Sequence, residues 1–218
     1  INFNKDKHAI EAITDTFKLI SFKTKLKEST ASIVDEKTTK IPNKLDEVFF
    51  NGRNSTINTN CIGKRQSLII GSYFILSGFW DKNILILHIS DSSKSFYLLN
   101  EYDNSSITYI DKDMHNHCVI FGTAKGSVVV YRVNPTPLKF EFHIGKHEHK
   151  APITALVMNN TLQLVASASK DGVVNIYTYP SFKTVRSIVV DNNACVTNVF
   201  LASSPLPCVV AYNAEKKR

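Results

Sequence analysis

The sequence predicts an all-β chain built from consecutive four-stranded units, and three observations lead to this prediction. The stretch 169–177 contains a tight turn at Asp171-Gly172, followed by a strand of β-branched and aromatic residues. A similar stretch, 124–131, lies 46 residues earlier, and a weaker copy, 80–87, lies 44 residues before that. A period of roughly 40–45 residues with four strands per unit is typical of the blades of a β-propeller.

The spacing predicts repeats at about 67–100, 107–143 and 153–188, with a fourth at 195–218 that the chain end truncates. In the fourth copy, Val210-Ala211-Tyr212 lies 45 residues after Val165-Ala166-Ser167. Three and a half units are too few to close a ring, because propellers have roughly 4–8 blades. We therefore expect an incomplete ring and a chain that is a piece of a longer protein.

The third repeat resembles a WD repeat residue by residue. It matches the family's Ser-x-Asp-Gly turn, has tyrosine where the family has tryptophan, and has a histidine four residues before its first strand. The resemblance implies that the histidine, serine, aspartate and aromatic residue form a buried hydrogen-bonded network inside the blade. Buried polar groups must be paired, so such a network selects one arrangement of loop and turn. The four network residues are His149, Ser169, Asp171 and Tyr177.

The neighbouring repeats match the WD pattern less well. Lys125 replaces the turn aspartate in the second copy, and Leu87 replaces the aromatic residue in the first copy. The resemblance is therefore strong for one blade and moderate for the other two.

The blades are expected to occupy residues 48–218, after a helical segment at 1–28 and a polar linker at 29–47. Apolar residues at 10, 13, 17 and 20 recur at spacings of three and four, which predicts a short helix over 6–20. Residues 29–47 are rich in Ser, Thr, Lys, Glu and Asp and contain Pro42, a composition typical of linkers.

Two segments carry a second resemblance, to BEACH proteins, in which a BEACH domain precedes WD repeats. Residues 6–17 are similar to the last segment of BEACH domains, although residues 18–21 replace the usual Gly-Gln-Thr-Pro. Phe79-Trp80-Asp81, followed by Asn83, resembles the start of a blade in these proteins. Trp80 is then either a blade-packing residue, the preferred interpretation, or a partner contact on the loop face.

Membership of this family implies a large cytoplasmic protein that acts on membrane surfaces in vesicle trafficking, protein sorting or autophagy. Peripheral association with endomembranes would then come through the rest of the parent chain. The chain contains no apolar run near 18 residues that would predict a membrane span. Its four cysteines form no Cys-x-x-Cys pair, which favours free thiols in a reducing compartment.

No catalytic or metal-binding motif is present in the sequence. The chain lacks Gly-x-Ser-x-Gly, a glycine-rich phosphate loop and His-Glu-x-x-His. His143, His147, Glu148 and His149 form one candidate metal cluster, but no fourth ligand of a structural site is evident. We expect no metal, no cofactor and no enzymatic activity. Sequence order does not constrain a Ser-His-Asp triad in space, so that possibility stays open.

The function that the sequence favours is a non-catalytic protein-interaction scaffold, which binds other proteins through the propeller faces. One alternative is a WD-repeat subunit of another assembly, such as a coat, a ubiquitin ligase or an RNA-processing complex. Less favoured alternatives are a propeller enzyme and a propeller that binds lipid or nucleic acid. The net charge of +7 is spread along the chain, which favours an ordinary solvated surface and no nucleic-acid partner. The oligomeric state is not set by the sequence.

Overall fold

The computed structural model describes residues 2–4, 9–13, 18–27, 30–40, 67–77, 83–88, 91–113, 117–190 and 195–213. Within these ranges the regular structure consists of β-strands and one short 3-10 helix, Ser92–Lys94. The all-β fold class is therefore confirmed. Among the same residues there is no helix with the length and apolar content needed to span a membrane.

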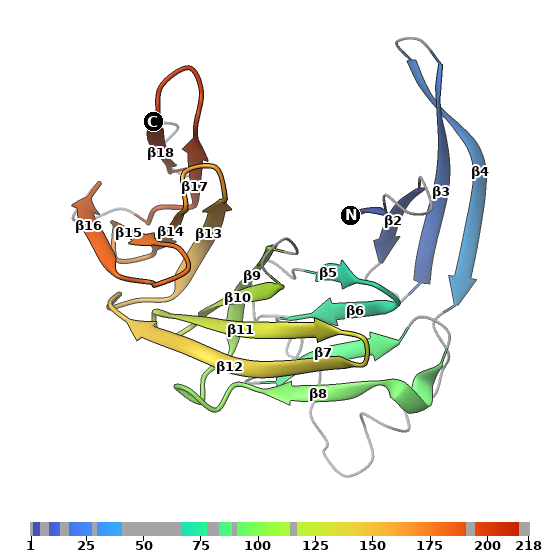
Figure 1. Cartoon of the computed structure of the whole chain (residues 1–218), viewed down its shortest axis with the longest axis horizontal. Helices are drawn as coiled ribbons and strands as arrows, with labels where there is room; N and C mark the ends of the chain where they lie inside the picture. Colours follow the sequence, from blue (N-terminus) through green and yellow to red (C-terminus); the bar gives the residue numbers. More distant parts are fainter. Residues whose placement is uncertain are drawn as a thin grey trace. The chain divides into compact units, whose positions relative to one another are not determined.

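The first forty residues contribute a four-stranded antiparallel sheet. Its strands follow chain order, so each pairs with the next (Figure 1). The sheet belongs to the first of two compact units into which the chain divides; the second unit contains residues 97–218. The strands of this sheet are β1 (Asn2–Asn4), β2 (Ala9–Ile13), β3 (Lys18–Lys27) and β4 (Thr30–Lys40).

The helix expected over 6–20 is wrong for its described part, because residues 9–13 form β2 and residues 18–20 belong to β3. Within 18–27, apolar residues at 20, 22 and 26 alternate with polar residues at 21, 23, 25 and 27, which is the two-residue period of a strand, and the β-branched Thr24 completes the pattern. This strand pairs along its whole length with 30–40. The ladder of ten residue pairs, which continues past a register shift between Lys23 and Thr24, outweighs the helical spacing of four apolar residues in a segment too short to be a stable helix alone.

The polar linker expected at 29–47 is also wrong for its described part. Residues 30–40 form β4, and residues 41–47 lie outside the described residues. Thr30, Ile33, Val34, Thr38 and Thr39 are β-branched and suit a strand, and charged residues are common on the edge strand of a sheet. The polar composition of residues 30–40 therefore reflects the position of β4 at the edge of the sheet.

Three further sheets begin at 67, 107 and 153, the residues at which the repeats were expected to begin. Each is again a meander in chain order. The strands are β5 (Ser67–Ile70), β6 (Tyr73–Leu76), β7 (Asn83–His88) and β8 (Phe96–Leu99); β9 (Ile107–Asp113), β10 (Cys118–Thr123), β11 (Ser127–Pro135) and β12 (Leu138–His147); β13 (Ile153–Asn159), β14 (Leu164–Ser169), β15 (Val173–Thr178) and β16 (Thr184–Val189); and the final pair β17 (Asn198–Ala202) and β18 (Cys208–Tyr212).

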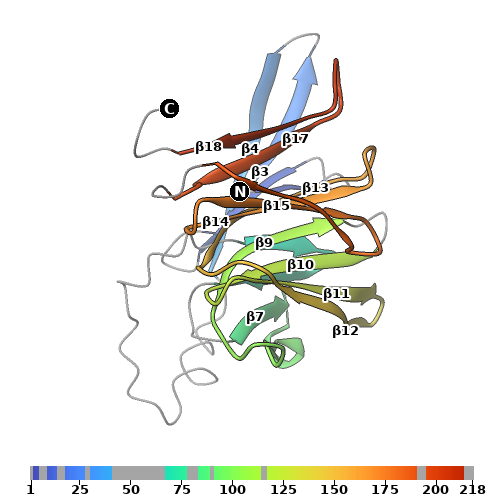
Figure 2. The same cartoon turned by 90° about the vertical axis from the view of Figure 1, so that its left-hand side faces the viewer.

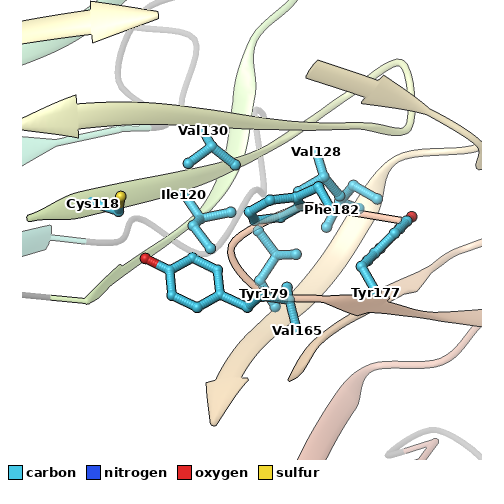
Figure 3. Close-up of a cluster of buried hydrophobic side chains, with 10 residues drawn as sticks. Cys118, Ile120, Val128, Val130, Val165, Tyr177, Tyr179 and Phe182 are labelled. Atoms are coloured by element: carbon cyan, nitrogen blue, oxygen red, sulfur yellow. The ribbon is translucent and has the colours of Figure 1, made fainter. Parts of the chain in front are cut away.

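In the second unit the last three sheets stack face to face (Figure 2). Side chains from β10 and β11, including Ile120 and Val130, pack against Val165 and Tyr177 of the next sheet and against Phe182 in the turn between β15 and β16 (Figure 3). Alanines of β13 and β14 then pack against the final pair of strands. Val209 lies in this second cluster, so it faces the preceding blade. The spacing of 45 residues had matched Val210 to Val165, so the structure shifts the equivalent position by one residue.

A threonine at the start of successive blades joins each blade to the next. Thr108 donates its hydroxyl to the carbonyl oxygen of Ile153 at 2.6 Å. Thr154, 46 residues later, donates in the same way to the carbonyl oxygen of Val196. The repeat in the sequence therefore extends to the hydrogen bonds between blades.

Candidate functional site

The turn between β14 and β15 is the centre of the candidate site, as the sequence predicts. Gly172 has a φ of 79°, which favours glycine. The Asp171 side chain accepts the backbone N–H of Val173 at 3.0 Å, as expected of an aspartate that starts a tight turn. The Asp-Gly pair therefore makes the turn through its own local chemistry.

The Asp171 carboxylate also reaches the loop before β13. Its two oxygens each lie 3.3 Å from Nδ1 of His149, and one of them accepts the backbone N–H of Lys150 at 2.8 Å. The His149 side chain is buried beneath the turn, with 2% of the residue exposed. The predicted contact between His149 and Asp171 is thus present, and it ties the loop to the turn.

The other ring nitrogen of His149 contacts two polar side chains. Nε2 lies 2.7 Å from Oγ of Ser167 and 3.2 Å from Nδ2 of Asn175. An amide nitrogen can only donate, so Nε2 is the accepting nitrogen and Nδ1 carries the proton that it donates to Asp171. The neutral ring is therefore held in one tautomer and one orientation.

Burial and hydrogen bonding shift the pKa values of this pair. Burial lowers the pKa of His149 below its ordinary value of 6.5, although the charge of Asp171 acts in the opposite direction. Burial alone would raise the pKa of Asp171. The N–H groups of Lys150 and Val173, together with His149, instead lower it below 3.8. At neutral pH the network therefore holds a neutral imidazole beside a carboxylate.

The lowered pKa of His149 predicts that the protein loses stability in mild acid. Below about pH 6.5 the unfolded chain takes up the His149 proton more readily than the folded chain, so the free energy of unfolding falls as pH falls. The contribution of Asp171 to the free energy of unfolding is lost only below its ordinary pKa of 3.8. We expect the difference in unfolding free energy between the wild type and His149→Gln to shrink from about pH 7.5 to about pH 5 in urea titrations. A difference that stays constant over this range would contradict the assignment.

The structure corrects one member of the predicted network. Ser167, not Ser169, contacts His149. Ser169 instead donates its hydroxyl to the carbonyl oxygen of Ala151 at 2.9 Å and accepts the backbone N–H of Asp171 at 3.2 Å. The two serines are two residues apart on β14 and share a face, so the strand pattern allowed either one. Ser169 lies beside the turn, and Ser167 lies two residues further from the turn along β14.

Tyr177 takes the place of the family's tryptophan in the network. Its hydroxyl oxygen lies 3.4 Å from Oγ of Ser167, and the side chain is completely buried. Burial raises the pKa of Tyr177 to about 12, so the hydroxyl keeps its proton. The chain of polar contacts therefore runs from Asp171 through His149 and Ser167 to Tyr177.

Asn175 is a network member that the WD-repeat pattern did not indicate. It lies on β15 and is buried. The available signal was its position two residues before Tyr177, on the same strand face, where a buried amide among apolar residues needs a partner.

The second blade carries a charge-reversed version of the same loop-to-turn arrangement. Asp103 lies 46 residues before His149, and Lys125 lies 46 residues before Asp171. The Asp103 carboxylate accepts the hydroxyls of Thr123 at 2.6 Å and Ser105 at 2.8 Å. Lys125 donates its ammonium group to the backbone carbonyl of Asp103 at 2.7 Å. The repeat period could have indicated Asp103. In the third blade the acidic residue, Asp171, lies in the turn, whereas in the second blade the acidic residue lies at the loop position equivalent to His149.

The connectivity Asp171–His149–Ser167 is that of a serine hydrolase triad, so its accessibility decides what it can do. The hydroxyl of Ser167 is sealed inside the blade, since the residue has 0% exposure and its oxygen also contacts Tyr177. A substrate carbonyl would have to open the blade to reach this oxygen. The geometry therefore supports a structural role for the triad.

The remaining predicted site residues do not join this network. Trp80 lies outside the described residues. In the candidate metal cluster, Nδ1 of His147 lies 3.0 Å from Oγ of Ser127, whereas His149 faces Asp171. In the described part of the chain no three His, Cys, Asp or Glu side chains are placed to hold a metal ion.

No family model and no curated protein matches this chain. Solved structures do match. The match to the computationally designed Ika4 protein has a TM-score of 0.53 at 17% identity, and it covers 68% of this chain and 84% of Ika4. Sqt1 of Chaetomium thermophilum, a WD-repeat protein, has a TM-score of 0.61 at 12% identity and covers 93% of this chain. The match covers 49% of Sqt1, so the chain spans about half its length. These likenesses show the fold, which is that of β-propeller blades of the WD-repeat type.

Proposed function

We propose that this chain is a non-catalytic protein-interaction scaffold. The observation that carries the proposal is the sealed network beneath the third-blade turn. His149 and Ser167 are at most 2% exposed, so their chemistry is used to hold loops rather than to meet a substrate. Loops positioned by a rigid sheet are the usual contact sites of such folds.

The bonds around this network make the turn end of the blade a rigid surface. The backbone N–H of Lys170 donates to the carbonyl oxygen of Pro152 at 3.0 Å, which adds to the bond from Ser169 to Ala151. The side chains of Lys150 and Lys170 are exposed there on loops that are already ordered. A partner that binds this end therefore loses less conformational entropy than one that must order free loops.

We further propose that the chain is the C-terminal WD-repeat region of a BEACH-type protein, which takes part in membrane trafficking and protein sorting on the cytoplasmic side of endomembranes. The WD-type blades support this proposal, as does the resemblance of Phe79-Trp80-Asp81 and Asn83 to the start of a BEACH-protein blade. Residues 6–17 add no support, because the described part of this segment is a strand.

The size and composition of the native polypeptide test this proposal. An antibody against the chain should detect, on a denaturing gel of the source cells, a band several times heavier than 24.5 kDa. Mass spectrometry of that band should find a BEACH domain N-terminal to the present sequence, and the protein should sediment with membranes. A band near 24.5 kDa, or a heavier band that contains no BEACH domain, would contradict the assignment.

A further inference from the structure

The second unit exposes a stack of two aromatic rings. Tyr102, in the loop between β8 and β9, and Phe142, on β12, have ring centroids 5.8 Å apart and an interplanar angle of 17°. Phe142 is 53% exposed and Tyr102 is 40% exposed. Large aromatic side chains that are exposed in a cluster are common anchors of protein interfaces.

The stack is supported from below. Tyr131 is buried and meets Phe142 edge to face, with centroids 5.9 Å apart, and the two residues are paired across β11 and β12. Tyr131 packs in turn on Phe121 at 5.5 Å. Gly145 lies under Tyr102, and a Cβ atom at this position would overlap the tyrosine ring. The backbone of β12 therefore forms a flat seat for Tyr102, and the exposed rings are pre-organised.

Two carboxylates lie near the stack, and the two lysines nearby are each held by an oxygen acceptor. Burial raises the pKa of Tyr131, and the charges of Glu101 and Asp103 raise it further, so both carboxylates act on the aromatic cluster. Glu101 is exposed and precedes Tyr102 directly. Two nearby lysines already have acceptors. Lys125 donates to the Asp103 carbonyl, and the Lys146 ammonium lies 3.8 Å from a Glu148 carboxylate oxygen.

We propose that the Tyr102–Phe142 stack is a docking platform for an arginine side chain on an extended segment of a partner protein. A guanidinium group is planar and weakly hydrated, and it stacks on aromatic faces. Glu101 and Asp103 attract its charge and repel acidic peptides and phosphates. The inference rests on the proposed scaffold function and names the chemistry of one of its contacts.

Peptide binding to the purified 218-residue chain tests the platform. The probe is a short Gly/Ser peptide that carries two arginines, compared with matched peptides that carry citrulline, lysine or glutamate in their place. Citrulline keeps the planar shape of arginine but has no charge. In NMR or fluorescence titrations we expect the arginine peptide to bind about three- to fivefold more tightly than the citrulline peptide, and the glutamate peptide to bind least.

Substitutions then locate the contact on the protein. Tyr102→Ala and Phe142→Ala should each remove the preference for arginine over citrulline, and Glu101→Gln should reduce it. Gly145→Ala should weaken binding as well, because it displaces the Tyr102 ring without deleting it. The matched control is Phe200→Ala, which removes an aromatic residue of similar exposure, 58%, on β17. Thermal melts check that every variant is folded.

Two results would overturn the platform. One is equal affinity for the arginine, citrulline and glutamate peptides. The other is a loss of binding in Phe200→Ala as large as that in Phe142→Ala. Neither result bears on the size and composition of the native polypeptide, so failure of this inference is distinguishable from failure of the proposed function.

Discussion

Gly126→Ala is expected to lower the free energy of unfolding by about 3 kcal/mol, the largest effect of any single change discussed for this protein. Gly126 lies in the turn between β10 and β11 with a φ of 90°, where an L-residue is strained. A Cβ atom there would also lie 2.5 Å from the carbonyl oxygen of His149 and 2.8 Å from that of Ala151. These are backbone atoms, so they cannot move aside without displacing the loop that carries His149.

A matched control separates the strain of a positive φ from the overlap with the His149 loop. Gly71 lies in the turn between β5 and β6 with a φ of 55°, and a Cβ atom there would meet nothing within 4 Å. Gly71→Ala should therefore cost only the conformational strain, about 1 kcal/mol. Urea titrations of both variants measure the difference. Equal losses for the two glycines would show that the close approach of the His149 loop is not a constraint.

Asp171→Ala is expected to destabilise the protein by about 1–3 kcal/mol, because it leaves the buried imidazole N–H of His149 and two backbone N–H groups without their acceptor. The carboxylate accepts the N–H groups of Lys150 and Val173 as well as Nδ1–H of His149. Asp171→Asn should lose less, since the amide keeps one acceptor oxygen. The melting temperature and the urea midpoint of the purified chain measure both effects.

A double-mutant cycle with His149→Ala tests whether these contacts act as a network. Because the two side chains are in contact, we expect the double variant to lose less than the sum of the single losses, by about 1 kcal/mol. Lys125→Ala is the matched control at the equivalent turn position of the second blade. Its side chain is exposed, and its removal should cost less than about 0.5 kcal/mol. Strict additivity of His149→Ala and Asp171→Ala would show that the two residues act independently.

The blades were predictable because their signals are local. Asp171-Gly172 determines a turn through its own side chain and its positive φ, and the strands on either side alternate or are β-branched. These features recur at intervals of about 45 residues, so three weak local signals support one another. The loop histidine and the turn aspartate could be paired because the third repeat resembles a WD repeat, and that resemblance implies a network of the two residues.

The N-terminal sheet was not predicted in this way, because a helical and a strand pattern follow each other in its sequence. Residues 10–20 satisfy a helical spacing, and residues 20–27 satisfy a strand spacing. Only the pairing of β3 with β4 over ten residue pairs, with a register shift between Lys23 and Thr24, decides between them. This ladder closes a hairpin over residues 18–40, which is longer than the window of about 11–18 residues in which a period is judged.

The sequence by itself determined the all-β class of the blades, the first residues of three repeats and the Asp-Gly turn, since each depends on spacing along the chain. The pairing of His149 with Asp171 followed from the resemblance of the third repeat to a WD repeat. Only the tertiary structure decided that Ser167 rather than Ser169 meets the imidazole, that Asn175 joins it, and that Tyr102 covers Gly145. These choices depend on the depth of a side chain between two packed sheets. Neighbours on one strand face are equivalent in the sequence, and they become different only when another sheet covers one of them.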